Sequence, residues 1–287
     1  MNSISLGRYI PYNSKIHRLD PRFKLFALII FMVAIFIRFP GNGTIYMNFI
    51  MYGIMAIIIF IIMAISHIKL KDLFKQLKSL WFMVILLLII NILIPNEGDF
   101  FIIFGGLKIY YQALYNTAYI FIRLVLMISL AMVLTGTTAP LDLTYAIEWY
   151  LTPLKIIKFP THEIAMTISI ALRFIPTLLD ETDRIMKAQS SRGVDFQNGK
   201  LKEKIRAIIS LIIPLLVSAF QRSEELANAM EARGYNPGAK RTRYRVLKWS
   251  IYDTLSLFLL LIFFGGVLYI SIARVDFVVL ITTLIGG

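Results

Sequence analysis

Residues 45–65 read IYMNFIMYGIMAIIIFIIMAI, a run of 21 residues without a single charge. About 20 consecutive apolar residues cross the hydrocarbon core of a bilayer as a helix. The whole chain of 287 residues is 58% hydrophobic and only 16% charged, which is more apolar than a soluble domain of this length requires. The sequence therefore predicts an integral membrane protein.

Four other apolar stretches are predicted to cross the membrane with this one. The first and third in chain order are short, the fourth carries Arg123 inside it, and an apolar tail after the last is too short to cross alone. The four stretches and the tail are Leu25–Phe39, Leu80–Ile94, Tyr110–Leu134, Ser250–Ile270 and Phe277–Ile285. We expect an all-α integral membrane protein with about five transmembrane helices, plus long helices in the cytoplasm or at the membrane interface.

The basic residues indicate the orientation of these spans. They cluster before the first span and between the second and third, whereas the loop Pro95–Lys108 is net acidic. The positive-inside rule then places the N-terminus in the cytoplasm and the C-terminus outside. The net charge of +13 is explained by this distribution and by attraction to anionic lipid, so no nucleic-acid partner is expected.

The segment Gly136–Lys248 contains two more apolar stretches, Ile164–Leu179 and Ala207–Phe220. Both are short and interrupted by proline, and crossing would place a strongly basic loop outside. We interpret them as parts of long helices against the inner membrane face. Apolar residues at 205, 208, 212, 215, 219, 226 and 230 give the second helix one apolar stripe. Ordinary helices of a membrane bundle remain an alternative for the apolar halves.

Two segments of this region, Thr161–Arg192 and Leu201–Arg233, repeat one pattern. Each has Ile-Pro near its middle, then acidic residues, then a small residue followed by Arg-Gly. Glycine after a helix permits the left-handed conformation of a C′ residue, and arginine in the last turn is favoured by the helix dipole. The six residues of these ends are Ser191, Arg192, Gly193, Ala232, Arg233 and Gly234. Either they only cap the helices, or the arginine forks insert into clefts on partner proteins.

Three motifs together resemble one family. They are the two small-Arg-Gly ends, the N-terminal run His17-Arg18-Leu19-Asp20-Pro21-Arg22-Phe23-Lys24, and Met230-Glu231-Ala232-Arg233-Gly234-Tyr235. With these motifs, the chain resembles the transmembrane T component of energy-coupling factor (ECF) transporters. The resemblance extends over nearly the whole length of the chain. Ser191 stands where the family usually has alanine.

The resemblance implies a non-catalytic scaffold in the prokaryotic cell membrane, where it is a multi-pass protein. Its implied partners are two cytoplasmic ATP-binding-cassette (ABC) ATPases, which bind the ATP, and a membrane S component that captures a vitamin or other micronutrient. The resemblance implies that Arg192 and Arg233 dock in grooves of the ATPases. We expect residues 1–135 to form an N-terminal membrane domain, 136–248 a cytoplasmic coupling domain, and 249–287 a final span and tail.

Catalytic and cofactor chemistry is not expected in this chain. The run Gly193–Leu201 departs from a P-loop in spacing and lacks the magnesium-binding Ser or Thr, and the three histidines are scattered without metal-ligand spacing. Arg123 is the one charge deep in a predicted span, so either it has a functional role or it pairs with a polar group in the bundle or at the S-component contact. The alternative function is a self-sufficient carrier, although midspan polar residues are few: Asn91, Asn116, Thr117 and Arg123.

Overall fold

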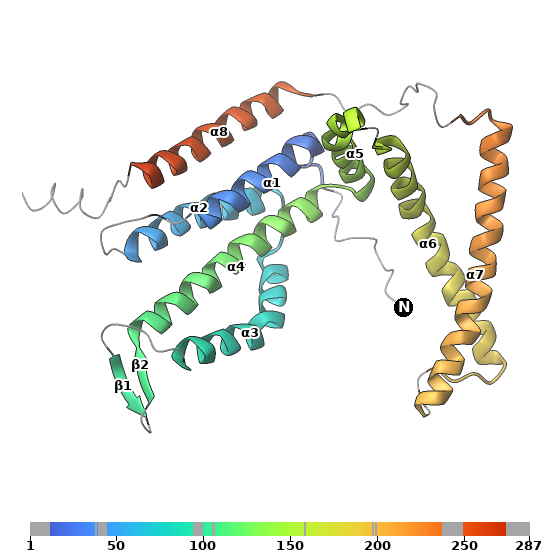
Figure 1. Ribbon diagram of the computed structural model, residues 1–287, viewed down its shortest axis with the longest axis horizontal. Helices are drawn as coiled ribbons and strands as arrows, with labels where there is room; N and C mark the ends of the chain where they lie inside the picture. Colours follow the sequence, from blue (N-terminus) through green and yellow to red (C-terminus); the bar gives the residue numbers. More distant parts are fainter. Residues whose placement is uncertain are drawn as a thin grey trace, which may run out of the picture. The chain divides into compact units, whose positions relative to one another are not determined.

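The computed structural model describes residues 12–37, 39, 45–93, 100–104, 107–157, 159–196, 198, 200–236 and 249–273. In these ranges the chain is helical apart from its loops and one short antiparallel hairpin (Figure 1). The elements are α1 (Pro21–Phe36), α2 (Ile45–Ile65), α3 (Leu70–Leu93), β1 (Phe100–Phe104), β2 (Leu107–Tyr110), α4 (Tyr111–Thr137), α5 (Pro140–Leu151), the 3₁₀ helix η1 (Thr152–Ile157), α6 (Thr161–Ser191), α7 (Leu201–Ala232) and α8 (Ile251–Ile272). The predicted all-α class of membrane protein is confirmed.

Within the described ranges five helices are long and apolar enough to cross a membrane, but they are not the predicted five. They are α2, α3, α4, α6 and α8. The predicted first span corresponds to α1, whose 16 residues extend only about 24 Å against about 30 Å of hydrocarbon. Conversely, α6 meets the requirement by length and composition, because its apolar half contains few charges. Whether α6 lies in the membrane or along its surface stays a prediction, as does the orientation of the spans.

The helix that contains the third predicted span begins ten residues earlier than predicted, at Leu70 instead of Leu80. Its first turns carry Asp72 and several lysines, and a search for apolar runs does not register such an amphipathic segment. The apolar tail Phe277–Ile285 lies outside the described residues.

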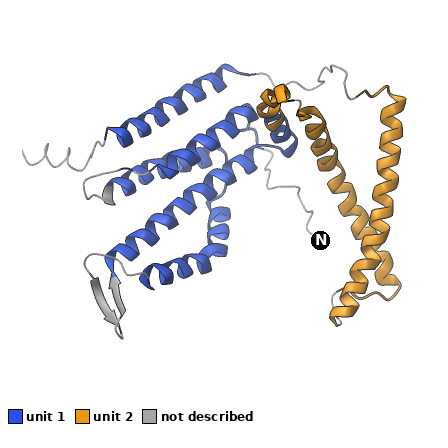
Figure 2. Ribbon diagram, in the orientation of Figure 1, with its two compact units in different colours: residues 1–146, 247–287 blue, residues 147–246 orange. Residues whose placement is uncertain are grey.

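The chain forms two compact units, residues 1–146 with 247–287 and residues 147–246 (Figure 2). In unit 1, α1 packs against α4 and α8, and α4 also packs against α2 and α3. Their shared core includes the fully buried side chains of Ile35, Met55, Ile59 and Leu126. The predicted domain ranges 1–135, 136–248 and 249–287 stay a prediction, because compactness of the chain does not by itself define functional domains.

Arg123 joins three helices inside unit 1. From α4 its guanidinium donates to the hydroxyl oxygens of Tyr52 (3.2 Å) and Tyr119 (2.8 Å), and to the carbonyl oxygen of Ile35 (3.3 Å). Tyr52 donates to the same carbonyl at 2.9 Å. Ile35 lies in the last turn of α1, where carbonyls lack partners within the helix and the helix dipole is negative. Arg123 therefore provides a hydrogen-bond donor and a positive charge to the C-terminal end of α1. It pairs with polar groups inside the bundle, which is one of the expected roles.

In unit 2, α6 and α7 pack against each other. Pro176 and Pro214 lie inside these helices, as the sequence predicts. Only Thr161, Ala165 and Ala207 are buried in the two helices together. Of the predicted apolar stripe on α7, residues 205, 208, 212 and 219 are exposed, whereas 215, 226 and 230 are half-buried. The buried residue of α7, Ala207, lies outside the predicted stripe.

Candidate functional site

The end of α6 is built as predicted. Arg192 is the C-cap residue, and Gly193 follows it with a φ of 86°. The N–H of Val194 donates to the carbonyl of Gln189 (3.1 Å), and that of Gly193 donates to the carbonyl of Ser190 (3.0 Å). These two bonds define a Schellman motif, which satisfies carbonyls that the helix leaves open. Glycine is favoured at the C′ position because its backbone is left-handed there.

The end of α7 repeats this geometry. Arg233 is the C-cap residue, and Gly234 has a φ of 69°. The N–H of Tyr235 donates to the carbonyl of Met230 (3.0 Å), and that of Gly234 to the carbonyl of Glu231 (2.8 Å). The expectation that both glycines are C′ residues is confirmed. The resemblance between the two sequence segments thus extends to the hydrogen bonds of their backbones.

Both docking candidates present their charge to solvent. Arg192 and Arg233 are exposed, as are the small residues Ser191 and Ala232 before them. Ser191 uses its hydroxyl within the helix, donating to the carbonyl of Lys187 at 3.1 Å. A cation at a helix C-terminus is favoured by the macrodipole, so the arginines are electrostatically compatible with capping and with binding an anionic group. Their docking role stays a prediction.

One contact between α6 and α7 was not anticipated. Arg222 of α7 donates to the carboxylate of Glu181 on α6 at 3.1 Å. Both side chains are partly buried, with 33% and 20% of their surface exposed. Arg184 also approaches Glu181, but at 3.9 Å and from an exposed position. The acidic residues after Pro176 were evident in the sequence, yet nothing in it indicates which basic residue of the other helix they meet.

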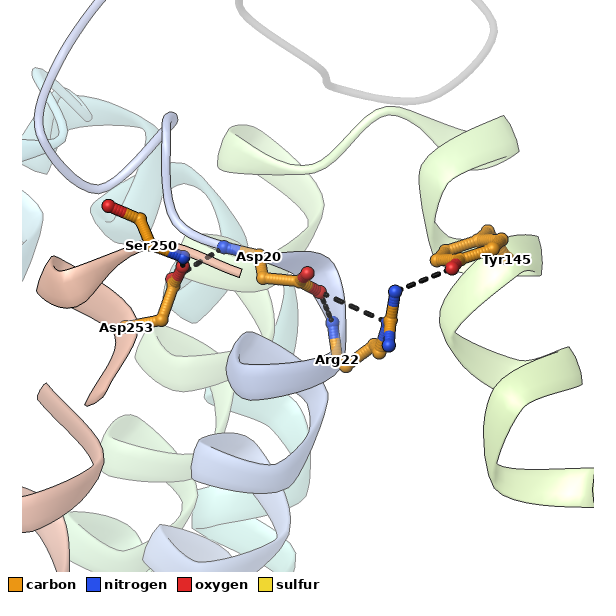
Figure 3. Close-up of polar contacts among 5 residues, drawn as sticks. All are labelled: Asp20, Arg22, Tyr145, Ser250 and Asp253. Atoms are coloured by element: carbon orange, nitrogen blue, oxygen red, sulfur yellow. Dashed lines mark hydrogen bonds and ion pairs between the residues drawn. The ribbon is translucent and has the colours of Figure 1, made fainter. Parts of the chain in front are cut away.

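A second polar cluster lies at the start of α1, where the sequence had indicated only helix initiation. Asp20 is the N-cap residue and accepts from the N–H of Arg22 at 2.9 Å, and Pro21 occupies the first helical position. The backbone N–H of Asp20 donates in turn to the carboxylate of Asp253 at 2.8 Å. Asp253 also accepts from the N–H of Ser250 at 2.7 Å (Figure 3). This carboxylate, which is 1% exposed, therefore joins the first turns of α1 and α8.

Arg22 and Lys24 extend this cluster toward other helices. The guanidinium of Arg22 lies 3.6 Å from the Asp20 carboxylate and donates to the hydroxyl of Tyr145 on α5 (Figure 3). The ammonium of Lys24 donates to the carbonyl of Thr137, at the end of α4, at 2.9 Å. Burial lowers the pKa of Lys24 from 10.5 to about 8, although neighbouring carboxylates oppose this shift. The cluster is thus a compact arrangement of opposite charges that ties several chain segments together.

The described residues offer no group of three or more His, Asp or Glu side chains that could hold a metal ion. Of the midspan polar residues, Asn91 of α3 donates to the hydroxyl of Thr117 on α4 at 3.3 Å, and Thr117 donates to the carbonyl of Ala113. Arg123 is engaged as described above. These side chains therefore bond with each other and with the backbone, which is the pattern of helix–helix contacts in a membrane.

Comparison with known proteins identifies related sequences. The model of a family described as cobalt transport protein (CbiQ) matches residues 12–244. The energy-coupling factor transporter transmembrane protein EcfT of Macrococcus caseolyticus is 45% identical over 261 residues, covering 91% of this chain and 96% of the relative. EcfT of Bacillus subtilis is 42% identical, covering 88% and 93%, and EcfT of Staphylococcus aureus is 43% identical, covering 89% and 92%. These similarities extend over both units.

Proposed function

The chain belongs to the family of energy-coupling factor transporter transmembrane proteins, and from this premise we propose that it is the scaffold that links two ABC ATPases to a substrate-binding S component. It is a multi-pass membrane subunit of a transporter. We place it in the plasma membrane of a bacterium, with the ends of α6 and α7 in the cytoplasm. ATP hydrolysis occurs in the partner ATPases, and the cargo is a vitamin or another micronutrient.

The observation that carries this proposal is the pair of equivalent helix ends. Arg192 and Arg233 follow helices of 31 and 32 residues, and the backbone on either side of each arginine forms the same Schellman hydrogen bonds. Two equal projections match two ATPase subunits that present similar grooves. A guanidinium can form two parallel bonds with one carboxylate, which gives such a contact a defined orientation. Docking at these ends transmits ATP-driven closure of the ATPases through α6 and α7 toward the S component.

The experiment is a charge reversal at both ends. In the chain expressed with its two ATPases and S component, Arg192→Glu with Arg233→Glu is expected to lower recovery of the ATPases by at least about tenfold, because each docking contact becomes repulsive. A pull-down from detergent-solubilised membranes measures the recovery. The amount of chain in the membrane fraction should stay unchanged.

Two exposed basic residues on the same helices provide the matched control. Lys187→Glu with Arg206→Glu changes the net charge by the same amount without touching the helix ends. This control should retain the ATPases. Equal recovery from the Arg192/Arg233 variant and the wild type would refute the docking role.

A further inference from the structure

Three exposed lysines lie at the start of α3, away from the helix ends and the polar clusters described above. Lys71, Lys75 and Lys78 are spaced by four and three residues, so they form one stripe along the helix. None of them has an ion pair with another described residue. Asp72, the acidic residue of these turns, lies in the first turn, where the helix dipole favours it. The lysines therefore repel each other without a counter-charge in the described part of the chain.

A strip of large apolar side chains runs beside the lysines. Phe74 and Trp81 are 67% and 61% exposed, and Leu70, one turn before Phe74, is exposed as well. The next strip around the helix is the one that packs inside unit 1, where Leu73 is buried and Leu77 lies against the core. Around α3 the order is thus a packed strip, an exposed apolar strip and a basic strip. A helix that enters the membrane interface has this order, from protein to hydrocarbon to headgroups.

The length of α3 also brings these turns to the membrane surface. The charge-free part of the helix, Ser79–Leu93, has 15 residues and extends about 22 Å, against about 30 Å of hydrocarbon. For α3 to cross the bilayer, the turns that carry the lysines must enter the interface, where aromatic rings are favoured and lysines extend their ammonium groups toward the headgroups. In Figure 1 the first turns of α3 run in a different direction from the rest of the helix, which suits turns that follow the membrane surface.

The three lysines together with Leu70, Phe74 and Trp81 form what we call the lysine–aromatic surface. We propose that this surface binds anionic phospholipids of the cytoplasmic leaflet. The ammonium groups attract the lipid phosphates, and the apolar strip contacts the acyl chains beside them. One lipid molecule carries both groups next to each other, whereas an acidic protein surface matches the lysines alone. The proposal is independent of the proposed function, because it requires neither the ATPases nor the S component.

Trp81 can report on this contact directly. The sequence has three tryptophans, so Trp149→Phe with Trp249→Phe leaves Trp81 as the only one. The full chain with this background is placed in nanodiscs that contain phosphatidylcholine and phosphatidylglycerol, with one of the two lipids brominated in its acyl chains. Bromine quenches the fluorescence of an adjacent tryptophan. The quenching over a series of lipid mixtures therefore gives the relative binding constant of the two lipids at Trp81.

Phosphatidylglycerol is expected to bind at Trp81 at least about fivefold more strongly than phosphatidylcholine, which is the effect of a single lysine near an anionic surface. Changing the three lysines together to glutamine should lower this ratio to about one. The corresponding change to arginine keeps the charge, so the ratio should stay as in the wild type. In 0.5 M salt the wild-type ratio should fall, because the attraction is screened.

A matched control removes the same charge from unit 2. Lys187→Gln, Lys202→Gln and Lys204→Gln, at three exposed positions, should leave the ratio at Trp81 unchanged. A wild-type ratio of about one would overturn the proposal, as would an equal loss in this control. It would also be overturned if neither brominated lipid quenched Trp81, since protein and not lipid would then cover the surface.

A pull-down of the assembled transporter tests for a protein partner at the same surface. The glutamine variant of the three α3 lysines is expected to recover the ATPases and the S component in the same amounts as the wild type. Loss of one of these subunits, with the lipid ratio at Trp81 unchanged, would mean that the lysine–aromatic surface binds protein, and the proposal would be wrong.

Discussion

The two units of the molecule differ in where their polar and apolar side chains find partners. In unit 1, apolar residues from α1, α2, α4 and α8 form a continuous core, and Arg123 and Asp253 are satisfied inside it. In unit 2, the long helices α6 and α7 bury only three residues between them and leave most of their isoleucines exposed. Apolar surface of this extent requires a lipid or protein partner. Unit 1 also exposes apolar side chains, on α3 and α8 above all, but it contains a buried core of its own. The helices α6 and α7 form almost no core, so their stability depends more on the lipid or protein around them.

The largest effect that distinguishes the units is expected at Arg123. Arg123→Met keeps an unbranched apolar stem but removes the donors to Tyr52, Tyr119 and the Ile35 carbonyl, so the free energy of unfolding should fall by about 2 kcal/mol. The Tyr52 hydroxyl still bonds the carbonyl, which limits the loss. Denaturant unfolding of the purified chain in detergent, followed by tryptophan fluorescence, measures the change.

Arg173→Met is the matched control, since Arg173 is an exposed arginine in the apolar half of α6. It should leave the unfolding midpoint within error of the wild type. If Arg123→Met and Arg173→Met lowered the free energy of unfolding equally, the hydrogen bonds of Arg123 would not be what stabilises unit 1.

The sequence predicts unit 2 more accurately than unit 1, although unit 1 is the better packed. The ends of α6 and α7 are specified locally, by a glycine at C′ and by the arginine before it, so they are found within a residue. In unit 1, the sequence of the short first span does not indicate that the Ile35 carbonyl accepts a hydrogen bond from Arg123, 88 positions later. The bond between Asp20 and Asp253 joins residues 233 positions apart. Such pairings depend on tertiary packing, which hydropathy and local motifs do not encode.

A smaller effect is expected at the helix ends of unit 2. Gly193→Ala and Gly234→Ala should each destabilise the last helical turn by about 1 kcal/mol, because alanine is strained at a positive φ. No atom lies close enough to clash with the added methyl group, so the cost is one of backbone conformation alone. Hydrogen exchange at the N–H groups of Val194 and Tyr235, which close the two motifs, should accelerate about fivefold.

Gly265→Ala is the corresponding control in unit 1. This glycine lies inside α8, equally without close neighbours and without a positive φ. Alanine is favoured over glycine within a helix, so stability should rise slightly. If all three substitutions slow exchange alike, the left-handed geometry of the two helix ends is not what holds them.

The smallest effect is expected for the ion pair that connects α6 and α7. Arg222→Met and Glu181→Gln should each reduce the stability of the contact by less than about 1 kcal/mol, because the pair is partly exposed and screened by water. A double-mutant cycle on unfolding isolates the coupling between the two residues, which should shrink further in 0.5 M salt. The cycle between Arg184 and Glu181, at 3.9 Å and with Arg184 largely exposed, should give no measurable coupling. A coupling energy in the Arg222 pair as large as the effect of Arg123→Met would show that unit 2 also contains a strong internal polar contact. The two units would then differ only in how much apolar surface they bury.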